Sequence, residues 1–206
     1  MRTVCITLSS SHANNQGGNK DPAVARSRME GLDADFFIGI HAKKLGIETT
    51  LTYEVDHPGT EFRAGATVVG CWLSHRTLWA ALSLLPDEEV LVVEDDAKFP
   101  DGWRERLTAA LRDVPPDWDM LWIGSCCTED KPKTHIAGDV WDVRYPMCTH
   151  GYVVRKKALQ TLIETQDDAR LYAPIDISMV FHSFPKLHVY TVLPRILDQW
   201  DTVLAP

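Results

Sequence analysis

The sequence predicts an α/β fold in which a mainly parallel sheet is flanked by helices. Segments rich in β-branched and aliphatic residues alternate along the chain with segments whose apolar residues recur at helical spacing. One strand-like segment, residues 90–93, is an unbroken Val/Leu run, which is typical of a strand buried on both faces. No repeat or linker-like segment interrupts the 206 residues, so we expect one domain at residues 1–206.

The individual elements follow from strand-forming residues and from helical periodicity. Strands are expected, in chain order, at residues 2–8, 35–40, 49–55, 88–96, 117–124, 149–154 and 187–193. Helices are expected at residues 22–32, 70–85, 103–111 and around 159–163. A Gly/Asn-rich loop at residues 9–21 precedes the first helix, Pro86 ends the second, and Asp101 is the expected N-cap of the third.

Composition and charge argue against several functional classes. The formal net charge is −8, and basic residues form only short segments such as Arg155–Lys157, unlike the basic stripe of a nucleic-acid-binding protein. The N-terminal apolar run is too short for a signal peptide, and no run approaches the ~18 apolar residues of a membrane span. The five cysteines have no zinc or disulfide-framework spacing, so we expect reduced thiols in a cytoplasmic protein.

Three consecutive carboxylates follow the apolar strand. Glu94, Asp95 and Asp96 come directly after residues 90–93, and in open α/β sheets ligands bind beyond the carboxyl ends of the strands. Like charges this close repel one another unless water or a cation lies among them. Mg²⁺ and Mn²⁺ prefer oxygen ligands, and Mg²⁺ commonly combines one or two carboxylates with substrate phosphates. The alternative interpretation is a solvated acidic turn without a metal.

A longer pattern contains this acidic turn. GCWLSH at Gly70–His75, a helix, and then VLVVEDDAKF at Val90–Phe99 resemble glycosyltransferase family 25. That family includes bacterial lipooligosaccharide galactosyltransferases and procollagen galactosyltransferases. Three later segments resemble the family in the same order: DWDMLWIG at residues 117–124, HGYVVRKKALQTLI at residues 150–163 and PIDISMVFHSFP at residues 174–185. The resemblance covers most of the chain from about Ala66 onward.

The resemblance implies a GT-A type enzyme that takes a hexose from a UDP-sugar with the help of Mn²⁺ or Mg²⁺. Asp96 would bind the metal that bridges the donor diphosphate, while Glu94 or Asp95 would face the ribose or complete the metal's ligands. A divalent cation suits this reaction because the departing diphosphate gains negative charge.

The resemblance implies further residues near the donor, each with a structural alternative. Ser74 and His75 would lie at the donor site, although His75 shares a helical face with apolar residues, which favours a hydrogen-bonded core histidine. Arg26 and Arg28 match arginines near the nucleotide, or are surface charges of a helix. His188 matches the late metal-binding His of some GT-A enzymes, whereas a solvent-facing histidine is the alternative.

Asp176 matches the family residue that would act as the general base. In an inverting transfer, one carboxylate takes the proton of the acceptor hydroxyl as its oxygen attacks the anomeric carbon. Pro174 and the apolar residues after Asp176 indicate a helix start, so Asp176 is also a candidate N-cap. The two roles are compatible. If Asp176 is not the base, Asp167 or Asp168 is the alternative.

Two positions depart from the family pattern. Val68 stands where the family has an acidic residue before the Gly-Cys pair, and Ile177 stands where it has a Glu after the base. We expect a metal-dependent, inverting hexosyltransferase that uses a nucleotide-sugar donor, with galactose as the first candidate. A glycan such as a lipooligosaccharide is the expected acceptor, ahead of a protein hydroxyl or a modified nucleic-acid base. The alternatives are a degenerate nucleotide-sugar-binding protein without turnover and a metal-dependent phosphohydrolase.

Overall fold

The computed structural model describes residues 1–8, 31–46, 51–54, 61–126, 131–143, 145–166 and 173–199. The expected loop at residues 9–21, most of the helix expected from Pro22, and the candidate residues Arg26, Arg28, Asp167 and Asp168 lie outside these ranges.

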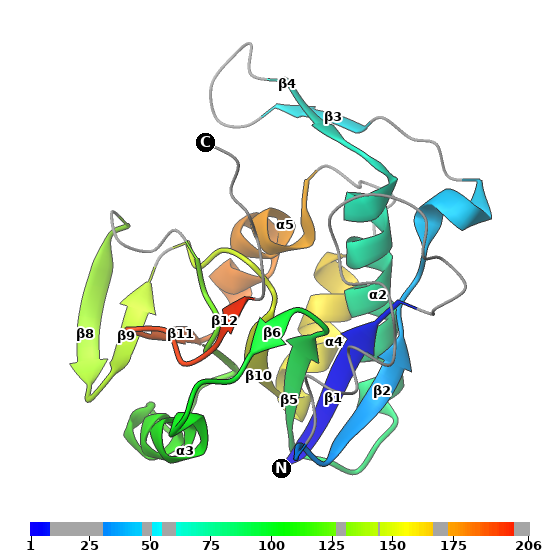
Figure 1. Cartoon of the computed structure of the whole chain (residues 1–206). Helices are drawn as coiled ribbons and strands as arrows, with labels where there is room; N and C mark the ends of the chain where they lie inside the picture. Colours follow the sequence, from blue (N-terminus) through cyan, green and yellow to red (C-terminus); the bar gives the residue numbers. More distant parts are fainter. Residues whose placement is uncertain are drawn as a thin grey trace.

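An eight-stranded sheet forms the centre of the described chain (Figure 1). In spatial order its strands are β2 (Ala34–Ile38), β1 (Arg2–Thr7), β5 (Glu89–Glu94), β10 (Gly151–Arg155), β7 (Met120–Trp122), β11 (Val189–Val192), β9 (Val140–Val143) and β8 (Lys133–Ala137). β10 and β9 run antiparallel to their neighbours, and the other six strands share one direction. The expected mainly parallel sheet is therefore confirmed, with two reversed strands.

Within the described ranges, four α-helices cover the sheet: α2 (Ala66–Ser83), α3 (Trp103–Asp113), α4 (Lys156–Thr165) and α5 (Ile175–His182). Short elements join them: η2 (Ala42–Leu45), η3 (Phe184–Lys186), the pair β3 (Leu51–Glu54) and β4 (Glu61–Ala64), and the pair β6 (Ala97–Lys98) and β12 (Asp198–Gln199). Of the strand expected at residues 49–55, the described part is β3, which belongs to the separate β3–β4 pair and not to the main sheet.

Alternating residues of the central strands pack into two hydrophobic layers, one on each face of the sheet. On β5, Val90 and Val92 pack with α2, α4 and α5, whereas Leu91 and Val93 pack on the opposite face with α3. Successive side chains of a strand point to opposite faces, so an unbroken apolar run indicates helices on both sides. These four side chains are at most 3% exposed, which confirms the doubly buried strand expected from the sequence.

Two local expectations were wrong. Asp101 does not cap α3: the N-cap residue is Gly102, whose φ of 76° is left-handed, and no side-chain capping hydrogen bond forms. The helix expected from Gly70 begins earlier, at Ala66, and the β8–β9 hairpin was not expected at all.

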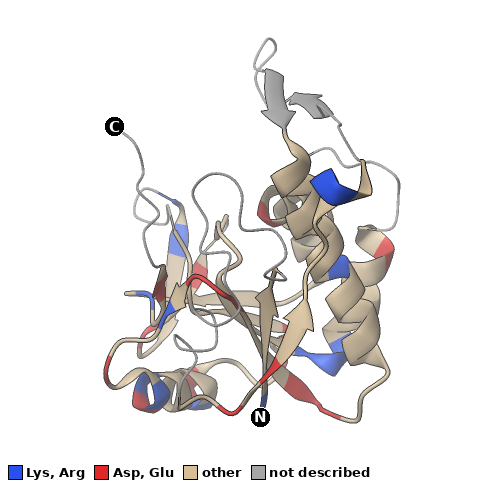
Figure 2. Ribbon diagram, turned by 45° about the vertical axis from the view of Figure 1, so that its right-hand side comes forward, with Lys and Arg blue, Asp and Glu red and all other residues tan. Residues whose placement is uncertain are grey.

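Charged residues of both signs are interspersed over the described ribbon (Figure 2). Several form surface ion pairs, such as Arg2 with Asp35 and Arg106 with Asp139. Among the described residues, no helix combines the length and the apolar composition that crossing a membrane requires.

Candidate functional site

The site lies where the carboxyl end of β5 meets the beginning of β10. β1 pairs in parallel with β5, so that Ile6 lies opposite Glu94. β10 pairs antiparallel with β5, with Gly151 opposite Val93, so the residues just before Gly151 lie beside Glu94. The backbone N–H of Glu94 donates to the carbonyl oxygen of His150 at 3.2 Å. Because β10 is antiparallel, the residues that precede it lie beside the carboxyl end of β5, where the three carboxylates are.

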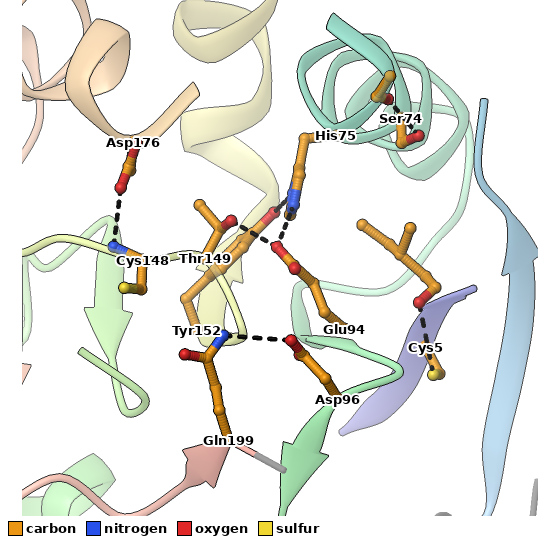
Figure 3. A network of polar contacts seen from close by, with 12 residues as sticks. Cys5, Ser74, His75, Glu94, Asp96, Cys148, Thr149, Tyr152, Asp176 and Gln199 are labelled. Carbon is orange, nitrogen blue, oxygen red and sulfur yellow. Dashed lines mark hydrogen bonds and ion pairs between the residues drawn. The ribbon is translucent and has the colours of Figure 1, made fainter. Parts of the chain in front are cut away.

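The three consecutive carboxylates have different partners (Figure 3). Their hydrogen-bond donors are His75 Nε2 and Thr149 Oγ1 for Glu94, Thr7 Oγ1 for Asp95 at 2.8 Å, and Gln199 Nε2 for Asp96 at 3.3 Å. All three carboxylates are half-buried. The three side chains are thus held by different elements of the fold.

Glu94 is held more firmly than its neighbours. Its side chain is 24% exposed, and its Oε1 lies 3.0 Å from Nε2 of His75. Burial acts to raise the pKa of Glu94, but the hydrogen bonds from His75 and Thr149 outweigh it and hold the pKa below its ordinary value. Glu94 is therefore a carboxylate at neutral pH.

Asp176 lies on the other side of the same segment. Its Oδ2 accepts the backbone N–H of Cys148 at 2.9 Å, and its Oδ1 accepts the N–H of Ile177 at 2.8 Å. The N-cap alternative is not what the structure has, because Pro174 occupies the N-cap position and Asp176 lies in the first turn of α5. Asp176 is half-buried.

Cys148 is constrained at three points. It forms a disulfide with Cys126, with the two Cα atoms 5.8 Å apart. Its N–H donates to Asp176, and its carbonyl oxygen accepts Nε1 of Trp122 at 2.6 Å. Its φ of 67° is in the left-handed region, which is uncommon for a residue other than glycine. Cys148 therefore holds a fixed backbone conformation beside Asp176.

The disulfide corrects the expectation of reduced thiols. Cys126 and Cys148 are 22 positions apart, and no spacing motif links them. A backbone hydrogen bond from Cys126 N–H to the Met147 carbonyl, 3.0 Å long, brings the two together. Of the described cysteines, Cys5 and Cys71 are free thiols.

One group of side chains has the spacing of a metal site, namely Cys71, His75 and Glu94. Their ligand atoms all lie within 4.8 Å of one another, and among the described residues the three consecutive carboxylates form no such group. Burial, and then the charge of Glu94, raise the pKa of the Cys71 thiol well above its ordinary value. Both ring nitrogens of His75 have protein partners, Tyr152 and Glu94, so these residues form a hydrogen-bonded cluster.

Two of the residues expected at the donor are buried behind the site. Ser74 is 3% exposed; its hydroxyl donates to the Gly70 carbonyl at 2.6 Å and accepts the N–H of Ile40 at 2.7 Å. This hydroxyl joins α2 to the loop after β2 and does not face a ligand. His75 is 1% exposed, which confirms the core alternative, and it reaches the site only through Glu94.

His188 is not part of the site. It directly precedes β11, which runs parallel to β7, and its carbonyl oxygen accepts the N–H of Asp119 at the beginning of β7. It therefore lies at the opposite edge of the sheet from Glu94 and Asp96. Its side chain is 59% exposed and pairs with Asp117 at 2.9 Å, so the solvent-facing alternative was the right one.

Sequence reasoning missed Cys148, Thr149 and Gln199. Thr149 is 7% exposed and binds Glu94, and Gln199 binds Asp96 from β12. The segment THGYVV was expected as a strand, but its direction in the sheet was not, and only that direction places Thr149 at the acidic turn. The signal that could have found Thr149 is the polar pair Thr149 and His150, directly before the buried strand β10.

Comparisons with known proteins show the family of the chain. The family model for glycosyltransferase family 25 (LPS biosynthesis protein) matches residues 20–137. A glycosyltransferase 25 family member of Anopheles gambiae is 27% identical over 172 residues, which cover 75% of this chain and 28% of that protein. The human inactive glycosyltransferase 25 family member 3 is 27% identical over 69% of this chain and 25% of its own length. Human procollagen galactosyltransferase 2 is 24% identical over 72% of this chain and 24% of its own length.

A solved structure shares the fold. It is a glycosyltransferase involved in the glycosylation of the major capsid of PBCV-1, with a TM-score of 0.52 and 12% identity, and the match covers 98% of this chain and 94% of that one. This likeness supports the GT-A type α/β fold. The chain spans about a quarter of the length of the curated relatives named above. Because the family model matches more than half of the 206 residues, the chain belongs to glycosyltransferase family 25.

Proposed function

We propose that the chain transfers a hexose from a UDP-sugar to a hydroxyl group of a glycan, with the help of Mn²⁺ or Mg²⁺ and with inversion at the anomeric carbon. One observation carries the proposal. Cys148 and Thr149 are consecutive, and the first binds Asp176 through its N–H while the second binds Glu94 through its hydroxyl. Two consecutive residues thus link the candidate base to the acidic turn, which supports our assignment of both to one site.

The acidic turn fits a hard divalent cation. Glu94, Asp95 and Asp96 offer only oxygen atoms, which Mg²⁺ and Mn²⁺ prefer. Asp96 is the residue we assign to the metal, as the resemblance to the family implies; its Oδ2 lies 3.3 Å from Nε2 of Gln199. One carboxylate is sufficient when the donor diphosphate supplies further ligands. When bound, the cation would stabilise the negative charge that develops on the departing diphosphate.

Asp176 is the residue we assign as the general base. Each of its oxygens accepts one backbone N–H, which fixes the carboxylate plane and leaves lone pairs for an acceptor hydroxyl. Asp176 would take the proton of that hydroxyl while the hydroxyl oxygen attacks the anomeric carbon. Galactose is the first candidate for the sugar because a relative is named procollagen galactosyltransferase 2. A bacterial lipooligosaccharide is the first candidate acceptor, in keeping with the family's description as an LPS biosynthesis protein.

A second candidate function is nucleotide-sugar binding without turnover. A relative with 27% identity is named an inactive glycosyltransferase 25 family member. In this chain Ile177, directly after the candidate base, replaces an acidic residue of the family pattern, and Val68 replaces another. Both of these side chains are half-buried and contribute no charge.

Nucleotide binding and turnover test the proposal in two steps. Thermal unfolding is measured with UDP, GDP and CMP, each with and without Mn²⁺. Ligand at ~100 times its dissociation constant adds about 2.7 kcal/mol of stability. Stabilisation by UDP that requires Mn²⁺ supports the donor site, and no stabilisation by any nucleotide contradicts it. Release of UDP from UDP-galactose in the presence of a glycan acceptor then supports the transferase, whereas binding without release supports the second candidate.

A further inference from the structure

Three deeply buried side chains form a line of hydrogen bonds that ends at Glu94. The indole Nε1 of Trp79 donates to the hydroxyl of Tyr152 at 2.9 Å, and that hydroxyl lies 2.9 Å from Nδ1 of His75. Nε2 of His75 lies 3.0 Å from Oε1 of Glu94. Trp79 and Tyr152 are 0% exposed, and His75 is 1% exposed. In Figure 3, the hydroxyl of Tyr152 and the carboxylate of Glu94 both meet the His75 ring.

The donors and acceptors of this line fit only one arrangement of protons. An indole N–H can only donate, so the Tyr152 oxygen accepts from Trp79. Burial raises the pKa of Tyr152, so its hydroxyl keeps its own proton, and Nδ1 of His75 is the acceptor within reach. A carboxylate can only accept, so Nε2 of His75 carries the imidazole proton and donates it to Glu94. With Nδ1 bare and Nε2 protonated, every group in the line has a partner of the right kind.

The opposite arrangement would leave groups unsatisfied. If Nδ1 of His75 carried a proton, the Tyr152 oxygen would face two donors, and the Tyr152 proton would lose its acceptor. A buried polar hydrogen without an acceptor is costly. The Tyr152 hydroxyl therefore selects the histidine tautomer that points an N–H at Glu94.

The end of the line fixes the carboxylate. Oε1 of Glu94 accepts from both His75 and Thr149, and these two donors come from different elements, α2 and the segment before β10. No other hydrogen bond to the Glu94 side chain forms within the described ranges of the chain, so Oε2 is the atom left for a ligand. At 24% exposure, the carboxylate is at the boundary between the core and the site.

We propose that Tyr152 is a positioning residue of the donor site: its hydroxyl fixes the His75 tautomer, and His75 together with Thr149 then holds Glu94 with Oε2 toward the ligand. The proposal rests on the proposed function, because it takes the acidic turn that contains Glu94 as part of the donor site. It extends that function to residues that touch neither donor nor metal.

Two substitutions separate this role from simple packing. Tyr152→Phe removes one oxygen atom and keeps the ring, so the core volume barely changes, but Nδ1 of His75 loses its donor. Trp79→Phe removes a larger part of the same core, yet Tyr152 can still donate to His75. If Tyr152 acts only through packing, Trp79→Phe should weaken UDP binding more than Tyr152→Phe does. If Tyr152 acts by positioning, Tyr152→Phe should weaken UDP binding more. Tyr190→Phe, on β11, is the matched control.

The His75 tautomer is measured directly by long-range ¹H–¹⁵N NMR of the imidazole, with His75→Gln to assign the signals. We expect a protonated Nε2 and a bare Nδ1 in the wild type and in Trp79→Phe, and loss of this single tautomer in Tyr152→Phe. The dissociation constant of UDP in Mn²⁺ should rise about tenfold in Tyr152→Phe, as when a partner of a ligand-binding side chain is removed. Tyr190→Phe should change neither quantity.

Two results would overturn the proposal. One is a wild-type His75 that carries a proton on Nδ1. The other is a Tyr152→Phe protein that keeps both the wild-type tautomer and the wild-type UDP affinity. Failure of UDP to bind the wild-type protein at all would contradict the proposed function, whereas the NMR result would still report on the tautomer.

Discussion

The backbone N–H of Cys148 donates a 2.9 Å hydrogen bond to the carboxylate of Asp176, and the side chain of the same cysteine is bonded to Cys126. Cys148, three residues before the start of β10, thus connects the start of α5 to the segment after β7. Its neighbour Thr149 reaches Glu94 in the other direction. Two consecutive residues therefore set the relative positions of the candidate base and the acidic turn.

Removing the disulfide should destabilise the fold. The bond closes a loop with a sequence separation of 22, and a loop of that length corresponds to about 3 kcal/mol of unfolding free energy. Urea unfolding of the wild type with and without reductant measures the difference, and thiol titration should find two additional thiols after reduction. The control is the Cys126→Ala/Cys148→Ala double variant, which should be insensitive to reductant. A wild-type protein whose stability and thiol count ignore the reductant would contradict the disulfide.

Replacing Asp176 should separate binding from turnover. Asp176→Asn keeps the size of the side chain but replaces one acceptor oxygen by an NH2 group, which removes the basic carboxylate and one of the two backbone hydrogen bonds. Transfer should fall by roughly 10²-fold or more while UDP binding is retained. The comparison is UDP release from UDP-galactose against UDP affinity by calorimetry. Asp117→Asn, at the opposite edge of the sheet beside His188, is the control. Transfer that survives the substitution would place the base on another residue.

Replacing Asp96 should remove the metal dependence of donor binding. Asp96→Asn takes away the charge that we assign to the cation, so Mn²⁺ should no longer increase the affinity for UDP. The measurement is UDP titration at several Mn²⁺ concentrations, with the exposed Asp101→Asn as the control. If UDP affinity in Mn²⁺ is the same in Asp96→Asn and in the wild type, Asp96 does not hold the cation.

Stability should fall when the pH is lowered below about 6.5, the ordinary pKa of histidine. Burial lowers the pKa of His150 in the folded protein, although the hydrogen bond to the Leu197 carbonyl acts in the opposite direction. Below pH ~6.5 the unfolded chain therefore binds a proton more readily than the folded one, and this stability contribution is lost as the pH falls through the lowered pKa. The pKa of Glu94 is also lowered, but its contribution disappears only below about pH 4.3.

Urea unfolding between pH 7 and pH 5 measures this dependence. The slope of stability against pH should be smaller in His150→Gln than in the wild type. The control is His135→Gln on the exposed β8–β9 hairpin, which should keep the wild-type slope. Equal slopes in His150→Gln and the wild type would show that another group titrates in this range.

Gly124 should tolerate no side chain. A Cβ there would lie 2.5 Å from both Cδ2 and Nε2 of His150, and the ring cannot move away because it is 1% exposed. Gly124→Ala should therefore cost about 1–3 kcal/mol of unfolding free energy, as overpacking does. Gly65→Ala is the control, since a Cβ at that position meets no heavy atom within 4 Å. A Gly124→Ala protein as stable as the control would show that His150 can move.

Local patterns predicted much of the fold. The unbroken run at residues 90–93 indicated a strand buried on both faces, and the two hydrophobic layers on either side of β5 confirm it. The apolar face around His75 indicated a core histidine, and the ring is 1% exposed. These predictions succeeded because burial depends on the periodicity of neighbouring residues.

The errors concern residues whose role depends on distant parts of the chain. The resemblance to GT-A enzymes with a late metal-binding histidine offered His188 as a metal ligand, with a solvent-facing histidine as the alternative. Because β11 runs parallel to β7, His188 lies at the far edge of the sheet. Cys126 and Cys148 carry no spacing signal, and a β-bridge between their neighbourhoods brings them together. Ser74 belongs to the expected motif, yet the packing of α2 on the loop after β2 occupies its hydroxyl.

The sequence by itself determined the α/β class, the buried strand and the position of three carboxylates at its end, because each follows from residues that are neighbours in the chain. The tertiary structure decided which groups meet those carboxylates. The reversed direction of β10 places Thr149 beside Glu94 and Cys148 beside Asp176. The same strand carries the buried Tyr152, whose hydroxyl hydrogen-bonds to His75 and selects its tautomer. Strand direction and hydrogen-bond partners depend on packing between segments that are distant in the sequence, so a local pattern does not predict them.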